Sequence, residues 1–289
     1  MKKSKHILLL LFIGFTTIGF TQNLVTFEDQ MAELNILGKQ ILTSETDEAK
    51  HNSNTAYKSA LKTLIETEAS FDYDFSALKT ISILQANNLK IYNWVVPLTD
   101  DTYEYFAFLQ IKTGKEKYRI VELADKSESI KTPENRMLTN KNWYGALYYK
   151  IIHSKKLGND KYTLLGWDGN NLLTNKKIID VVTTSEKGII KFGASIFKTT
   201  KKTKKRIVFE YAKDVVMSLK YHANIEKIVF DVLVPSSSSL TGIYEYYGPT
   251  LETFDAFYID NKKWNYQKDI DIKLDPNLKD HFWEDPKKE

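Results

Sequence analysis

Apolar residues near the amino terminus recur at the spacing of an amphipathic helix. Residues 22–70 contain no proline and a single glycine, Gly38, so little in this stretch would break a helix. The first stripe of apolar residues steps by three and four positions and comprises Leu24, Phe27, Met31, Leu34, Leu37 and Ile41. A second stripe with the same kind of spacing comprises Tyr57, Ala60, Leu61, Leu64 and Ile65. We expect two amphipathic helices within a helical segment of residues 22–75, packed as a hairpin or against a sheet.

The polar run His51–Asn54 separates the two stripes. Consecutive polar residues of this kind favour a loop between two periodic segments, so the sequence predicts the break between the helices at these positions. Apolar stripes on such helices usually pack into a core. The alternative interpretation is that they form a groove for a partner.

From about residue 78 the pattern changes to short runs of β-branched and aromatic residues, separated by Gly, Asn, Asp, Ser or Pro. This pattern is typical of strands joined by turns. Two pairs of runs predict hairpins: Tyr103–Lys112 with Lys117–Leu123, and Phe254–Ile259 with Trp264–Tyr266. In Val215–Tyr221, apolar positions alternate with largely polar ones, which predicts a half-buried strand, and Ile225–Leu233 predicts the next.

Turns follow at short intervals with no helical pattern between the strands, which favours antiparallel meanders over parallel crossover units. The sequence therefore predicts an α+β protein, with amino-terminal helices followed by a predominantly antiparallel β-rich domain at residues 76–289. A meander sheet, a sandwich and an open barrel all fit this composition. A propeller fits less well, because strands, turns and tryptophans recur without a fixed period of about 40 to 50 residues.

The first 21 residues have the features of a signal peptide. Lys2, Lys3 and Lys5 precede the apolar stretch Ile7–Phe20, and small residues before Gln22 suit cleavage at that point. A membrane anchor is the alternative, but this stretch is shorter than the roughly 20 apolar residues that span a bilayer. We expect an exported protein, periplasmic or secreted, with no transmembrane segment after cleavage.

Charge and cysteine content exclude several classes of function. The chain has 41 basic and 37 acidic residues, and removal of the leader's three lysines leaves a nearly neutral protein, which argues against a nucleic-acid partner. The sequence contains no cysteine. Disulfides, thiolate nucleophiles, cysteine-based zinc sites and iron–sulfur clusters are therefore excluded.

Catalytic and cofactor motifs are absent from the sequence. After cleavage the histidines would be His51, His153, His222 and His281, none of them at metal-ligand spacing. The run Gly193–Phe197 matches only the first half of a serine-hydrolase elbow. No glycine-rich nucleotide loop is present. We therefore expect no cofactor and no metal.

Two charged segments allow a functional and a structural interpretation. The basic run Lys198–Arg206 could attract phosphates, acidic glycans or lipid headgroups, but it lacks interleaved aromatic residues and is better interpreted as a solvated loop between two strands. The carboxylates of Asp269–Asn277 are spaced closely enough to suggest calcium. That segment lacks the glycine and the bidentate glutamate of a calcium loop, and its apolar residues alternate as in a strand.

The candidate binding residues are Trp167, Asp168 and Asn170, in the segment Tyr162–Asn171, where an apolar strand ends in a turn. The Asp-Gly pair suits a tight turn with positive φ. The tryptophan could stack on a sugar ring while the aspartate accepts hydroxyl hydrogen bonds. In the alternative, which we favour, the tryptophan covers the edge of the core and the aspartate stabilises the turn.

Several segments of the β region resemble an uncharacterised group of exported proteins of Gram-negative bacteria. The segments are YTLLGWDGNN at 162–171, KKIIDVV at 176–182, KFG at 191–193, RIVFEY at 206–211, IVFDVLVP at 228–235 and YYGPTLETFDAFYIDNKKW at 246–264. The resemblance covers roughly residues 78–268. It implies export and a shared β unit, and it transfers no chemistry.

Three functions are compatible with the sequence. The first is a non-catalytic exported protein that binds a glycan, a peptide or another component of the cell envelope. The second is a carboxylate-based hydrolase of glycan or peptide, because paired carboxylates leave no sequence motif; the candidates are Asp168, Glu210, Asp231 and Asp255. The third is an assembly or chaperone-like protein that uses the acidic helical segment, which exposed apolar stripes would favour.

Overall fold

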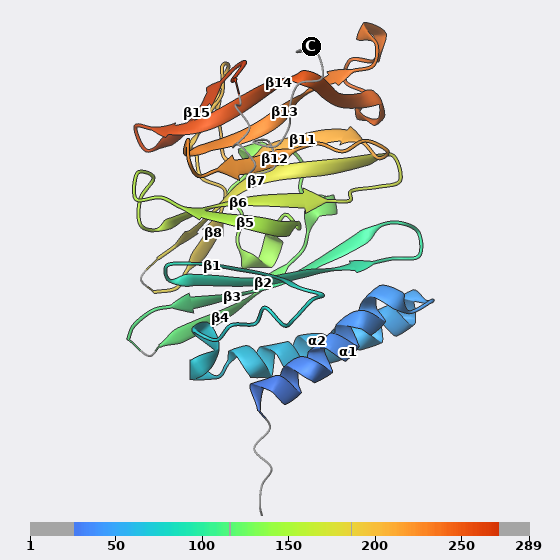
Figure 1. The fold of residues 1–289 in the computed structure, drawn as a ribbon, viewed down its shortest axis with the longest axis vertical. Coiled ribbons are helices and arrows are strands. Elements are labelled where there is room, and N and C mark those ends of the chain that lie inside the picture. Colours follow the sequence, from blue (N-terminus) through green and yellow to red (C-terminus); the bar gives the residue numbers. More distant parts are fainter. Residues whose placement is uncertain (1–25, 116, 186, 272–289) are drawn as a thin grey trace, which may run out of the picture.

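The computed structural model describes residues 26–115, 117–185 and 187–271. The expected leader, Leu24 and the part of the carboxyl-terminal segment after residue 271 lie outside the described residues. Two helices and three β-sheets stack in four layers along the long axis of the molecule (Figure 1). The layers follow chain order except that β9 and β10 of the third sheet precede β11 of the second.

The first layer is a pair of helices, α1 (Phe27–Thr43) and α2 (Asp47–Ile65). Each begins after a threonine whose hydroxyl accepts a backbone N–H, Asp29 N for Thr26 and Ala49 N for Thr46. Such caps satisfy N–H groups that have no partner within the helix. The helices therefore separate at residues 44–46, at the cap formed by Thr46.

The predicted break at His51–Asn54 is wrong, because these residues lie inside α2. Asn54 is buried, and its Oδ1 accepts a hydrogen bond of 2.7 Å from Trp94 Nε1 on the neighbouring sheet. Polar composition suggested a loop, but this hydrogen bond lets a polar side chain face the core without remaining unsatisfied.

The apolar stripes of both helices are buried, as the periodicity predicts. Met31, Leu34, Ile41, Tyr57, Leu61, Leu64 and Ile65 form one core cluster with Tyr92, Trp94, Val96 and Phe108 of the first sheet. Phe27, Leu37 and Ala60 pack at its margin. The stripes are therefore core and are not available as a groove for a partner.

The first sheet is an antiparallel meander, and its other face is also buried. Its strands follow chain order: β1 (Ser82–Ala86), β2 (Leu89–Pro97), β3 (Tyr103–Lys112) and β4 (Tyr118–Ala124). The predicted hairpin between β3 and β4 is confirmed. Neighbouring residues of β2 point to opposite faces: Ile91 packs toward the second sheet and Tyr92 toward the helices.

Buried Lys90 on β2 binds the segment that connects α2 to this sheet. Its Nζ donates to the carbonyl oxygens of Ser70, Phe71 and Tyr73 at 3.2, 3.0 and 2.7 Å. Ser70 and Phe71 belong to the 3₁₀ helix η1 (Glu68–Phe71). Burial lowers the pKa of Lys90 to about 8, since desolvation disfavours the ammonium form.

The second sheet is buried on both faces. In spatial order it contains β11 (Ile207–Ala212), β7 (Thr174–Thr184), β6 (Lys161–Asp168) and β5 (Leu147–His153), with β8 (Ile190–Phe192) also on β7. Leu164 and Ile178 pack toward the first sheet, whereas their chain neighbours Leu165 and Ile179 pack toward the third. This explains why both strands contain apolar runs without alternation.

The third sheet closes the stack. Its order is β10 (Thr203–Lys204), β9 (Phe197–Lys198), β15 (Lys263–Gln267), β14 (Tyr247–Asp260), β13 (Lys227–Pro235) and β12 (Leu219–His222). Pairing is antiparallel except between β15 and β9. The predicted hairpin of β14 and β15 is confirmed, with φ of 49° at Asn261 and 59° at Lys262 in its turn.

Three local expectations in this region need correction. The sequence predicts a strand at Val215–Tyr221, but only the part from Leu219 onward is a strand in the structure (β12). Burial nevertheless alternates along the whole segment. The basic run is a short β9–β10 hairpin whose last residues are tied down: Lys204 pairs with Glu134 at 2.7 Å, and Lys205 Nζ donates to Asn135 O. Residues 269–271 form no strand.

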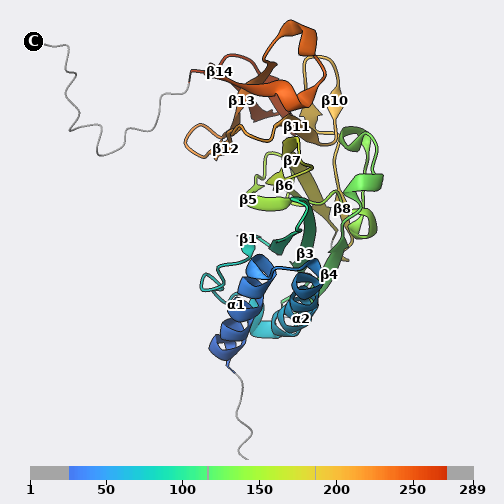
Figure 2. The same ribbon diagram turned by 90° about the vertical axis from the view of Figure 1, so that its right-hand side faces the viewer.

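The fold class is confirmed as α+β, with helices followed by mostly antiparallel sheets. Within the described ranges no sheet closes into a barrel, and no helix there has the length and apolarity to cross a membrane. The segment between β4 and β5 lies along one side of the stacked sheets (Figure 2). It contains three 3₁₀ turns, η2 (Ser127–Ser129), η3 (Pro133–Asn135) and η4 (Asn140–Asn142), and its residues line two cavities on this side.

Candidate functional site

Two neighbouring cavities on this side of the molecule share five lining residues, and we refer to them together as the cleft. The first has a volume of about 820 Å³ and lies among the start of β3, the end of β4 with the loop after it, and the connection from β6 to β7. The second, of about 630 Å³, continues between the η3 segment, β11 and η6 (Tyr244–Tyr246). The residues that line both cavities are Ser127, Glu128, Tyr144, Asn170 and Lys176.

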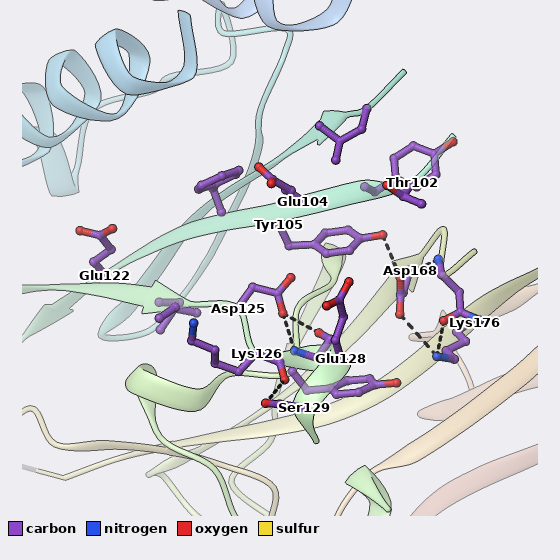
Figure 3. Close-up of a pocket in the computed structure, with 18 of the residues that line it drawn as sticks. Thr102, Glu104, Tyr105, Glu122, Asp125, Lys126, Glu128, Ser129, Asp168 and Lys176 are labelled. Carbon is purple, nitrogen blue, oxygen red and sulfur yellow. Dashed lines mark hydrogen bonds and ion pairs between the residues drawn. The ribbon is translucent and has the colours of Figure 1, made fainter. Parts of the chain in front are cut away.

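Asp168, at the end of β6, lies in the wall of the first cavity and is 5% exposed. Its Oδ1 accepts hydrogen bonds from the Tyr105 hydroxyl at 3.0 Å and from Asn170 N at 2.7 Å. Tyr105 in turn accepts Gly169 N at 2.7 Å. Figure 3 shows Asp168 between Tyr105 and Lys176. Asp168 therefore both stabilises the turn, as the favoured interpretation of the sequence had it, and faces the cleft.

The turn after Asp168 requires a glycine at position 169 and a residue with a left-handed backbone conformation at position 170. A Cβ on Gly169 would lie 2.3 Å from the ring of Tyr103, so a larger residue would displace that ring. Asn170 has a φ of 46°, a conformation that asparagine tolerates better than most residues. The Asp-Gly-Asn sequence thus brings the carboxylate of Asp168 and the amide of Asn170 to the same cavity.

The environment of Asp168 changes its acidity. Burial raises the pKa of its carboxyl, because the charged form loses hydration. Lys176, whose Nζ is 4.0 Å from Oδ2, and the hydrogen bonds from Asn170 and Tyr105 oppose this effect. The net result is a pKa above the ordinary value for aspartate.

Asn170 connects the two cavities through a polar network. Its Oδ1 accepts Lys176 Nζ at 2.5 Å, and its Nδ2 donates to Thr174 Oγ1 at 2.6 Å and to Glu210 Oε1 at 3.2 Å. Thr174 also donates to Glu210 Oε1 at 2.8 Å. Because these side chains hold one another, the polar surface at the middle of the cleft is preorganised.

Trp167 does not line either cavity. Strand alternation points it to the other side of β6 from Asp168, where it is half-buried and its ring meets that of Tyr103 edge-on, with centroids 5.1 Å apart. The structure therefore brings Asp168 and Asn170 to the cleft and places Trp167 behind its wall.

Of the four carboxylates considered for hydrolysis, two reach the cleft. Asp168 lines the first cavity and Glu210 the second. Asp231 instead accepts Ser218 N at 2.7 Å, and Asp255 accepts the Tyr266 hydroxyl and Asp269 N. Those two carboxylates belong to connections within and around the third sheet.

A buried ion pair lies next to Tyr144, one of the residues that line both cavities. Arg206 and Asp180, both 0% exposed, approach to 2.8 Å between Nη2 and Oδ2. The contact is electrostatic rather than a well-aligned hydrogen bond, since Nη2 has no partner with hydrogen-bond geometry. The guanidinium carbon lies 5.6 Å from the ring centre of Tyr144, which lines both cavities.

Several cleft residues were not identified from the sequence. They are Glu104, Tyr105, Glu122, Asp125, Glu128 and Tyr144. Asp125 and Ser127 have the spacing of an aspartate turn, and Asp125 Oδ1 does accept Ser127 N at 2.9 Å. That pattern indicates a turn and does not distinguish a binding site from any other loop.

Among the described residues, no group of three or more His, Cys, Asp or Glu side chains is arranged to hold a metal ion. Comparisons with known protein families, with curated proteins and with solved structures find no match. The function is therefore argued from the geometry of the cleft.

Proposed function

We propose that this protein is an exported, non-catalytic binding protein of the cell envelope, whose ligand is an extended polar chain, a glycan or a peptide, lying in the cleft. The observation that carries the proposal is that the two cavities adjoin and share five lining residues. Concave sites with a few convergent polar groups are typical of ligand binding, and a chain-like ligand would contact both cavities.

The chemistry of the lining supports binding to a polar chain. Hydroxyl, carboxylate, amide and ammonium groups converge where the cavities meet, at Ser127, Glu128, Asn170 and Lys176. Tyr103 and Phe106 add half-buried aromatic surface to the first cavity. Together these groups offer hydrogen bonds and an apolar contact along the same path.

The internal hydrogen bonds favour binding over catalysis. Asp168 Oδ1 accepts a hydrogen bond from Asn170 N, and Glu210 Oε1 accepts hydrogen bonds from Asn170 Nδ2 and Thr174 Oγ1. Both oxygens are therefore already engaged in stabilising the turn. One observation favours the hydrolase alternative, namely the raised pKa of Asp168, because a general acid must hold its proton near the working pH. Mass spectrometry of the ligand after incubation separates the two: a binding protein returns it intact, and a hydrolase returns fragments.

Replacing Asp168 with asparagine is expected to weaken ligand binding by about tenfold while changing stability by less than about 1 kcal/mol. The asparagine keeps an Oδ1 acceptor for Tyr105 and Asn170 N, and it removes the charge that faces the cavity. Calorimetric titration with soluble peptidoglycan fragments and with extended octapeptides measures binding, and a thermal melt measures stability.

Asp160→Asn is the matched control, because Asp160 has a side chain 52% exposed, is paired with Lys161 and lines neither cavity. Unchanged affinity in Asp168→Asn would contradict the assignment of the cleft. The pH dependence gives a second check: since burial raises the pKa of Asp168, the wild type should lose affinity as the pH falls through that raised pKa, sooner than an ordinary aspartate would. The asparagine variant should lack this loss.

Export is the second part of the proposal, supported by the basic and apolar features of residues 1–21. We expect the protein recovered from the periplasm or medium of a Gram-negative host to begin at Gln22. Intact-mass measurement of that material checks the expectation. Recovery with residues 1–21 still attached, in the membrane fraction, would contradict it.

A further inference from the structure

The cleft is acidic, although the protein without the three lysines of the leader has nearly equal numbers of basic and acidic residues. Its lining carboxylates are Glu104, Glu122, Asp125, Glu128, Glu134, Asp168 and Glu210. Its lining ammonium groups are Lys58, Lys126, Lys176 and Lys202. Negative charge is therefore concentrated in a concave, partly desolvated region, where the low dielectric of the walls strengthens its field.

Some of the lining carboxylates have a cationic partner and others do not. Glu122 pairs with Lys58 at 2.6 Å, and Glu134 pairs with Lys204 at 2.7 Å. Asp125 and Glu210 accept hydrogen bonds from neutral donors only, within the described residues. At the junction itself, Lys176 lines both cavities and its Nζ lies 4.0 Å from Asp168 Oδ2. The carboxylates of Asp125 and Glu210 therefore keep a negative charge without an ammonium partner among the described residues.

Glu128 is the most available of these carboxylates. It lines both cavities and is exposed. No hydrogen bond or ion pair joins its side chain to any other residue that the structure describes. A cationic group of a ligand could pair with it without displacing an internal partner.

Tyr144 provides an independent sign that the junction accommodates a ligand. The residue is 4% exposed and lines both cavities. Its hydroxyl makes no hydrogen bond with the part of the chain that the structure describes and is not among the buried polar atoms without a partner, so the oxygen is open to the cavity. A hydroxyl at this position can donate to a carbonyl oxygen or accept an N–H, which are the two groups that every peptide unit carries.

We propose that the chain held in the cleft is an extended peptide rich in lysine or arginine, an inference that rests on the proposed binding function. Its cationic side chains pair with Glu128 and the neighbouring carboxylates, and one of its backbone groups pairs with the Tyr144 hydroxyl. An uncharged glycan matches the hydroxyl but leaves the excess of negative charge without a counterpart.

The test is fluorescence anisotropy with a labelled octapeptide of alternating lysine and serine, blocked at both ends. We expect it to bind, and to bind more weakly as added salt shortens the Debye length. Its counterpart with glutamate in place of lysine should not bind. Glu128→Lys should raise Kd by about tenfold or more, because it replaces attraction with repulsion at the junction.

Two further variants localise the effect. Tyr144→Phe should raise Kd severalfold without lowering the Tm, since the lost hydroxyl has no partner within the described protein. Glu252→Lys, an exposed charge reversal on β14 outside both cavities, should leave Kd within about twofold.

Each other result overturns the inference in a distinguishable way. If an uncharged N-acetylhexosamine oligomer binds and the basic peptide does not, the ligand class is wrong and the binding function stands. Equal weakening by Glu128→Lys and Glu252→Lys would show attraction to the whole surface rather than to the cleft. If neither ligand binds, the inference and the proposed function fail together.

Discussion

Replacing Leu34 with aspartate is expected to lower the free energy of unfolding by about 4 kcal/mol. Leu34 is 0% exposed and lies in the core cluster between the helices and the first sheet. The substitution removes buried apolar surface and places a carboxylate there without a partner. Urea unfolding followed by circular dichroism measures the change.

Ile36→Asp on the same helix is the control, because Ile36 is 61% exposed. An exposed substitution away from a cap or an ion pair usually changes stability by less than about 0.5 kcal/mol. Equal midpoints for the wild type and Leu34→Asp would show that the stripe does not pack on the sheet. That result would return the helical segment to consideration as a surface for assembly or chaperone-like interactions.

Replacing Arg206 with methionine is expected to cost about 3 to 5 kcal/mol, because Asp180 would remain as a buried, unpaired charge. Both side chains are 0% exposed, and Asp180 Oδ2 otherwise receives only the Tyr148 hydroxyl, at 3.3 Å, within the described residues. The loss should extend to ligand binding, since Tyr144 at the junction of the cleft rests on the guanidinium.

The double variant Arg206→Met/Asp180→Leu should recover much of the lost stability, because replacing both ions with apolar side chains leaves no buried charge. Lys156→Met breaks the exposed pair of Lys156 with Glu226 and should leave the unfolding midpoint nearly unchanged. If the double variant loses as much stability as Arg206→Met does, the arginine acts through packing and not through the charge of its partner.

The sequence predicted helices and strands correctly where the spacing of apolar residues matches the spacing of buried positions in the structure. Residues of the α1 stripe recur at steps of three and four, and Met31, Leu34 and Ile41 are all buried. The turn between β3 and β4 follows from its polar residues and glycine. The break at His51–Asn54 failed because one long-range contact, from Trp94 to Asn54, makes a polar residue compatible with a buried helix face.

Only some of the candidate binding residues reach the cleft, and the reason is geometric. Trp167 and Asp168 are adjacent in the sequence, and adjacent side chains of a strand point to opposite sides. Asp168 reaches the cleft and Trp167 lies behind its wall. The sequence identifies this turn as unusual. To tell which of the two side chains faces the cleft, one must know on which side of β6 the cleft lies.

The sequence by itself determined the order of helices and strands, the burial of the helical stripes and the antiparallel character of the sheets, because periodicity and turn chemistry act over a few residues. The cleft depends on how the three sheets stack. Tyr105 and Asp168 are 63 residues apart in the chain and share a hydrogen bond, and Glu128 and Glu210 line the same cavity. Only the tertiary structure decided these contacts, because the free energy that brings distant strands together belongs to the packed core and leaves no local pattern at the residues that line the cleft.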